Sequence, residues 1–410
     1  MAHGITEHDA MIALFAHGQP WHKLATSIEA VATELGVTAA EVTARMAFEA
    51  KGILDQHIGT EPVLTLHPDF APTIRRIWLG GNGLSKEQIV EAIQKGIEVW
   101  DRHQAVVRED TRGQFAITSK GYTPWQNGDA ADMFDQVMRE AGGATLSCLG
   151  TLHGGRRVFV TAKLDEETRI GGTDDVTGYH LLMSNAHDAT QAVTWAVVAM
   201  RTVCANTHAI ALRQSTTGRR KRNTIRLRHT KGLKLRLDEV REALGLVSKA
   251  IAVYDEVAQF LAGVQVPDAE ALKGFVEALV PPADEGKSDA RREKKREAIY
   301  GNFMDTRRNA VEGVKGSWWT AYQAVTQFVD HGGNGKDDVG SAEKRFNSAL
   351  FGGGHDLKTE AFDLALAGAS GERFTAHGDG TVTIASPAGT TTVDGSDILG
   401  DLLSKPVSTN

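Results

Sequence analysis

Cysteine is almost absent from this sequence, and long apolar runs are missing. Cys148 and Cys204 are the only cysteines in 410 residues, which is too few for a disulfide framework or a four-cysteine zinc site. In a reducing compartment we expect both thiols to be free. No run of 18 uninterrupted apolar residues occurs, so the sequence predicts no membrane-spanning helix. Residues 1–9 contain acids where a signal peptide needs Lys or Arg, which favours a cytoplasmic protein.

Common catalytic motifs are missing as well. The sequence contains no GxGxxG, HExxH or GxSxG pattern, so we expect no cofactor and no resident metal. Pro267-Asp268 and Glu293-Lys-Lys295 match the letters of a metal-dependent nuclease, but both fall in sequence with helical character. An enzyme that uses His187, Asp188 and His208 is the alternative hypothesis. The simpler interpretation is that Asp188 caps a turn through its side chain.

The middle of the chain lacks acids. The whole sequence holds 52 Asp or Glu and 45 Lys or Arg, for a net charge of −7. Residues 189–237 contain no acid but eleven Lys or Arg, which leaves 34 basic and 52 acidic residues elsewhere. Ordinary solvated surfaces mix both signs. This basic stretch (residues 189–237) therefore concentrates positive potential on an acidic molecule, as the binding of a polyanion requires.

We predict that the basic stretch contacts the phosphates of a nucleic acid. Tyr122, Trp125 and Trp195 are candidates to stack on bases if they lie nearby. The alternative is a solvated loop followed by a basic helix end. The predicted phosphate-binding residues are Arg213, Arg219, Arg220, Lys221, Arg222, Arg226, Arg228, Lys231, Lys234 and Arg236.

Apolar residues make up 41% of the sequence, enough for a core, and their periodicity predicts an α+β fold with a mostly antiparallel sheet. A capping box at Ser85–Gln88 and apolar residues at helical spacing predict a helix over 86–103. Hairpin patterns follow, joined by helices. In order, we expect strands 104–108 and 114–118, helix 129–140, strands 144–152, 157–164, 179–184 and 192–203, a helix starting in 204–213, and an extended segment 224–230.

The C-terminal part is predicted to be helical. One apolar stripe runs from Leu237 to Tyr254, and a charged helix is expected to begin at Arg291–Glu297. An aromatic stripe at Trp318–Phe328 predicts a helix that packs in the core. Another helical stretch spans 345–366, and strands 374–377 and 381–385 follow. We divide the chain into an N-terminal region 1–84, an α+β core domain 85–235, a helical region 236–370 and a β-hairpin tail 371–410.

Several short motifs together resemble a known family. They are Pro20-Trp-His22, Tyr122-Thr-Pro-Trp-Gln-Asn127, Gly154-Gly-Arg-Arg157, Ser184-Asn-Ala-His-Asp188 and Arg201-Thr-Val-Cys-Ala-Asn-Thr207. In this order they resemble the phage- and plasmid-type family called domain of unknown function 932. The resemblance implies a mobile genetic element in a bacterial host. It supplies no established catalytic residue, so it transfers no site.

These observations predict a single-stranded DNA-binding protein of a phage or plasmid that acts in recombination or replication by strand annealing. The order of hairpins, helix and basic loop is similar to the core of phage single-strand annealing proteins. We therefore expect a homo-oligomer, with phage or host replication proteins as further partners and no membrane contact. The alternatives are a metal-dependent nuclease and a regulatory protein whose basic stretch binds an acidic host protein.

Overall fold

The computed structural model describes residues 38, 52–66, 83–140, 144–201, 207–210, 224–231, 247–283, 287–305, 311–331, 348–350, 352–379, 381–386 and 389–394. These ranges contain both helices and antiparallel sheets, so the predicted α+β class is confirmed. No helix within them is both long enough and apolar enough to cross a membrane.

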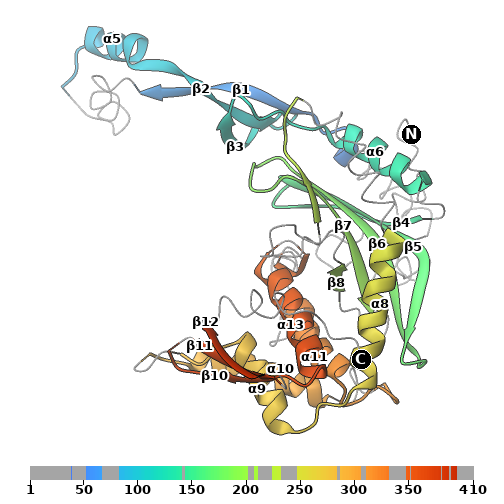
Figure 1. Ribbon diagram of the computed structural model, residues 1–410. Coiled ribbons are helices and arrows are strands. Elements are labelled where there is room, and N and C mark those ends of the chain that lie inside the picture. The colour runs from blue at the N-terminus through green and yellow to red at the C-terminus, as the bar shows by residue number, and fades with distance from the viewer. Residues whose placement is uncertain are drawn as a thin grey trace.

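A six-stranded antiparallel sheet forms the centre of the molecule (Figure 1). The strand order is β4-β5-β6-β7-β8, and β9 also pairs with β7. Both predicted hairpins of this region are confirmed, although β5 and β6 are longer than expected and form a third hairpin. The strands are β4 (Thr145–Leu152), β5 (Arg157–Ile170), β6 (Asp175–Ala186), β7 (Val193–Arg201), β8 (Thr207–Ile210) and β9 (Thr224–Leu227).

A second sheet forms an arm that extends away from the rest of the molecule, with α5 (Lys86–Gly96) at its far end (Figure 1). Its strands follow the order β1 (Ile58–Leu66), β2 (Ile97–Arg108) and β3 (Gly113–Ser119). Several large apolar side chains of the arm are exposed, namely Val90, Val99, Trp100 and Ile117.

The C-terminal helices pack against the central sheet and against each other. They are α8 (Val247–Gly263), α9 (Ala269–Leu279), α10 (Ala290–Met304), α11 (Trp318–His331) and α13 (Gly353–Ala369). A small sheet of β10 (Arg373–Ala376), β11 (Thr381–Ser386) and β12 (Gly389–Asp394) follows. The aromatic stripe on α11 is buried as predicted, with Trp318, Trp319 and Tyr322 at most 1% exposed.

One continuous cluster of buried side chains links the central sheet to the C-terminal helices and the small sheet. It includes Phe134 of α6 (Asn127–Glu140), whose ring lies 5.7 Å from that of Trp195 on β7. It continues through the face of the central sheet into the helices and reaches Phe374 on β10. The buried apolar face of the sheet is therefore covered by α6 toward one end and by the C-terminal helices toward the other.

One predicted helix is confirmed only in its first part, and another is wrong where the structure describes it. The helix predicted over 86–103 ends at Gly96, and Ile97 begins β2, because pairing with β1 takes over the residues that continued the apolar spacing. The helix predicted in 204–213 is a strand at Thr207–Ile210, which completes the ladder beside β7. The capping box at Ser85 is confirmed by two reciprocal hydrogen bonds with Gln88, of 2.9 and 3.2 Å.

The sequence also left two strands unassigned. β1 was missed because Pro62 interrupts its pattern, and the pairing with β2 indeed shifts register between Pro62 and Leu64. The tail forms three strands, because β12 adds to the predicted pair.

Candidate nucleic-acid interface

The edge of the central sheet next to β7 consists of two short strands in line. Ile210, the last residue of β8, pairs with Val197 of β7, and Thr224, the first residue of β9, pairs with Ala196. These partners are consecutive residues of β7. Ile210 and Thr224 therefore occupy adjacent positions on this edge, about 3.3 Å apart along the strand direction. Segment 211–223, with five of the predicted phosphate-binding residues, begins and ends at this one point.

Three of the predicted phosphate-binding residues lie on β9 or in the turn directly after it. Arg226, Arg228 and Lys231 are exposed, whereas Leu227 and His229 between them are buried. This alternation is the two-residue period of a strand with one face in the core. None of these three cations forms an ion pair with any residue in the described ranges. Their charges therefore face solvent.

The other predicted phosphate-binding residues lie outside the described residues. They are Arg213, Arg219, Arg220, Lys221, Arg222, Lys234 and Arg236.

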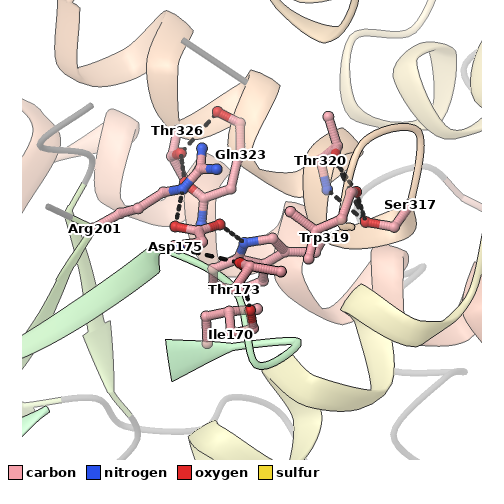
Figure 2. Close-up of polar contacts among 10 residues, drawn as sticks. Ile170, Thr173, Asp175, Arg201, Ser317, Trp319, Thr320, Gln323 and Thr326 are labelled. Atoms are coloured by element: carbon pink, nitrogen blue, oxygen red, sulfur yellow. Dashed lines mark hydrogen bonds and ion pairs between the residues drawn. The ribbon is translucent and has the colours of Figure 1, made fainter. Parts of the chain in front are cut away.

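One cation of the basic stretch has a different role. Arg201, at the end of β7, is 2% exposed, and its Nε donates to Oδ1 of Asp175 at 2.6 Å. The other carboxylate oxygen of Asp175 accepts from the indole Nε1 of Trp319 at 2.9 Å, as Figure 2 shows. The ion pair links β7 to β6 within the central sheet, and the bond from Trp319 joins Asp175 to α11. Arg201 therefore contributes to the core and not to a surface charge.

The family-like motifs converge beside the end of β9. Asn185 donates its side-chain amide to the carbonyl oxygen of Trp125 at 2.8 Å, and the hydroxyl of Tyr122 donates to the carbonyl oxygen of Ala186 at 3.1 Å. The backbone amide of His187 donates to the carbonyl oxygen of Arg156 at 2.7 Å. The loop 122–127, the turn before β5 and the end of β6 thus form one hydrogen-bonded unit.

The protonation of His187 follows from its partners. Asn127 donates its side-chain amide to the carbonyl oxygen of Ile53 at 3.1 Å, so its Oδ1 is the acceptor for His187 Nε2 at 2.8 Å. His187 then carries its proton on Nε2. Burial, with a smaller effect from His229, lowers the pKa of His187 to about 3. A neutral, fully buried imidazole holds this loop in place and does not exchange protons near neutral pH.

The predicted stacking residues differ in their exposure. Trp195 and Trp125 are 0% and 5% exposed and belong to the core cluster, so neither offers a ring face to a base. Tyr122 is half-buried and stacks on His229, with ring centroids 4.9 Å apart and planes 28° apart. Burial raises the pKa of Tyr122, with a smaller contribution from Asp188, which keeps its hydroxyl protonated as a donor.

Sequence reasoning missed His229. The alternation of basic residues with Leu227 and His229 could have indicated that His229 faces the core.

The residues of the alternative enzyme hypothesis have structural contacts. Asp188 Oδ1 accepts from the backbone amide of Thr190 at 3.1 Å and from its hydroxyl at 2.5 Å, which confirms the turn cap. Asp268 caps α9 by accepting from the amide of Ala271 at 2.8 Å. The side chain of His208 lies outside the described residues. Within the described part of the chain, no three His, Cys, Asp or Glu side chains form a metal-binding group.

The charged run on α10 also has a structural part. Arg292 donates to the carbonyl oxygen of Pro282 at 2.8 Å, and Arg296 donates to that of Val280 at 3.1 Å and also pairs with Asp289. These arginines hold the segment that follows α9, whereas Arg291, Lys294 and Lys295 are exposed on α10.

Comparisons with known proteins agree with the motifs. The chain matches no curated protein and no solved structure. A family model described as "Domain of unknown function (DUF932)" matches residues 114–351, which is more than half of the chain. The match includes the loop 122–127, the ends of β5 and β6, and the whole basic stretch. The chain therefore belongs to the DUF932 family.

Proposed function

We propose that this protein binds single-stranded DNA through its basic stretch and assists recombination or replication by annealing complementary strands. Its setting is a phage or plasmid in the cytoplasm of a bacterial host. The observation on which the proposal rests is the exposed row of Arg226, Arg228 and Lys231, which is part of 49 consecutive residues without an acid.

Charge and placement support this proposal. A phosphate backbone is bound by several cations that are free of carboxylate partners, and each contact releases a counterion. Strand β9 provides Arg226, and the residues directly after it provide Arg228 and Lys231. Segment 211–223 contains five more cations and begins and ends at the adjacent point on the sheet edge. The contacts are with phosphate, so binding should depend little on base sequence.

The direct test removes the three described cations. We expect Arg226→Gln/Arg228→Gln/Lys231→Gln to weaken binding to a labelled single-stranded oligonucleotide in fluorescence anisotropy. The slope of log affinity against log salt should fall in magnitude by about 2, from about 0.7 for each lost phosphate contact. The matched control is Arg291→Gln/Lys294→Gln/Lys295→Gln, which removes the same charge from the exposed side of α10.

The control separates a local effect from net charge. An equal change in both triple variants would mean that only overall charge matters, and an unchanged slope in the β9 variant would remove β9 from the interface. A wild-type protein that binds neither single- nor double-stranded DNA in the anisotropy assay would overturn the proposed function itself.

Strand annealing proteins act as assemblies, so we further propose that this chain forms a homo-oligomer. Sedimentation velocity over a range of concentrations, with and without oligonucleotide, tests this part. A monomer under all of these conditions would contradict it.

A further inference from the structure

The ladder that holds β9 ends before the last described cations. Leu227 pairs with Val193 of β7, and no later residue of this segment has a partner in the sheet. Thr230 donates to the carbonyl oxygen of Arg228 at 2.9 Å, which is a local turn. Arg228 and Lys231 therefore need another contact to keep a fixed position.

That contact comes from the loop 122–127. The backbone amide of Thr123 donates to the carbonyl oxygen of His229 at 3.1 Å, and the ring of Tyr122 stacks on the ring of His229. Among the described residues, this is the one tertiary backbone hydrogen bond to residues 228–231. Tyr122 is itself fixed, because its hydroxyl donates to Ala186 and its carbonyl oxygen accepts from Gln104 at 2.7 Å.

We infer that Tyr122 and His229 are positioning residues, which hold Arg228 and Lys231 in the orientation that contacts phosphate. This inference rests on the proposed function and gives the loop 122–127 a role in it. His229 lies between the two cations in sequence, directly after Arg228 and two residues before Lys231. Loss of the stack would free this end of the row while the ladder continues to hold Arg226.

The sequence alone suggested a different role for Tyr122, which is stacking on a base. The two roles predict different salt behaviour. A lost base contact lowers affinity by a similar factor at every salt concentration, because stacking releases no counterion. A lost phosphate contact lowers the slope itself.

The experiment compares Tyr122→Ala, Tyr122→Phe and His229→Ala in the anisotropy salt series. We expect Tyr122→Ala and His229→Ala to lower the slope by about 1.4, for two contacts at about 0.7 each. Tyr122→Phe keeps the ring stack and loses only the bond to Ala186, so it should retain the wild-type slope. All measurements are made well below each variant's thermal midpoint.

A stability control excludes a general effect of weakened folding. Gly274→Ala, on α9, is expected to destabilise the protein at a remote contact and should leave the slope unchanged. Lower affinity with an unchanged slope in Tyr122→Ala would support base stacking and overturn the inference. A wild-type slope in both alanine variants would also overturn the inference. Neither result would affect the proposed function, which is tested separately by DNA binding of the wild-type protein and of the charge variants.

Discussion

Asp175 of β6 accepts one hydrogen bond from Arg201 within the central sheet and one from Trp319, which joins the sheet to α11. A buried charge that loses its partner is costly, because water no longer solvates it. We expect Asp175→Ala to lower the free energy of unfolding by about 3–5 kcal/mol. Asp174→Ala is the matched control, because Asp174 is fully exposed and its contact with Arg169 is 3.4 Å long. Its removal should change nothing measurable.

Denaturant titration of both variants checks this prediction. Asp175→Ala/Arg201→Met removes both charges and should be less destabilised than Asp175→Ala alone. If the double variant has the lower free energy of unfolding, the unpaired charge of Arg201 is not the cause of the destabilisation in Asp175→Ala.

Three buried histidines, together with the half-buried His355, predict a pH dependence of stability. Burial is the main cause in each case, and it lowers the pKa of His180 and His187 to about 3 and the pKa of His229 and His355 to about 4. The unfolded chain has histidine pKa values of about 6.5. Between pH 6.5 and 4 the unfolded state therefore binds more protons than the folded state, and stability falls as the pH falls.

Each of these histidines should contribute about 1.4 kcal/mol per pH unit in that range. Guanidinium denaturation at pH 7.5, 6.0 and 5.0 measures how the free energy of unfolding changes with pH. His355→Gln should reduce this change by about 1.4 kcal/mol per pH unit. Stability that stays constant from pH 7.5 to 5.0 would show that the imidazoles are accessible to protons in the folded state.

At the scale of elements, α9 and β10 approach each other at Gly274. A Cβ built on Gly274 would overlap the carbonyl oxygen of Phe374, which is backbone and cannot rotate away. We expect Gly274→Ala to cost about 1–3 kcal/mol by overpacking. Gly301→Ala on α10 is the control, because a Cβ there meets nothing within 4 Å. It should stabilise the helix by about 0.5–1 kcal/mol.

Thermal unfolding of the two variants gives the comparison. A stable Gly274→Ala protein with β10–β12 still protected from hydrogen exchange would show that the contact between α9 and β10 is looser than the structure places it.

Local sequence patterns predicted most helices and strands but not the boundary between α5 and β2. The hairpins were predictable because alternation and turn residues are local signals, and the α11 core was predictable from its aromatic spacing. The end of α5 was not, since Ile97 and Trp100 continue the helical spacing and only pairing with β1 makes them a strand. The strand at Thr207–Ile210 has four residues, too few for a period, and depends on the free edge of β7.

At the scale of the whole molecule, the charge pattern predicted the candidate interface, but its geometry required the structure. A count of acids shows that the basic stretch is unusual. It does not show that Arg201 pairs with Asp175, that Trp125 and Trp195 are buried, or that His229 is held by Tyr122, because each depends on residues distant in sequence. The register with β7 is likewise needed to show that segment 211–223 begins and ends at adjacent positions on the sheet edge.

That register allows the most direct test of DNA binding through the basic stretch. Deleting residues 211–223 and joining Ile210 to Thr224 places two residues in sequence that already occupy adjacent ladder positions, within reach of one peptide bond. The joined chain should fold with at least the wild-type thermal midpoint. Its salt slope for single-stranded DNA should fall in magnitude by about 3.5, for five lost cations at about 0.7 each. A folded, joined protein that binds single-stranded DNA with the wild-type affinity and slope would contradict the account.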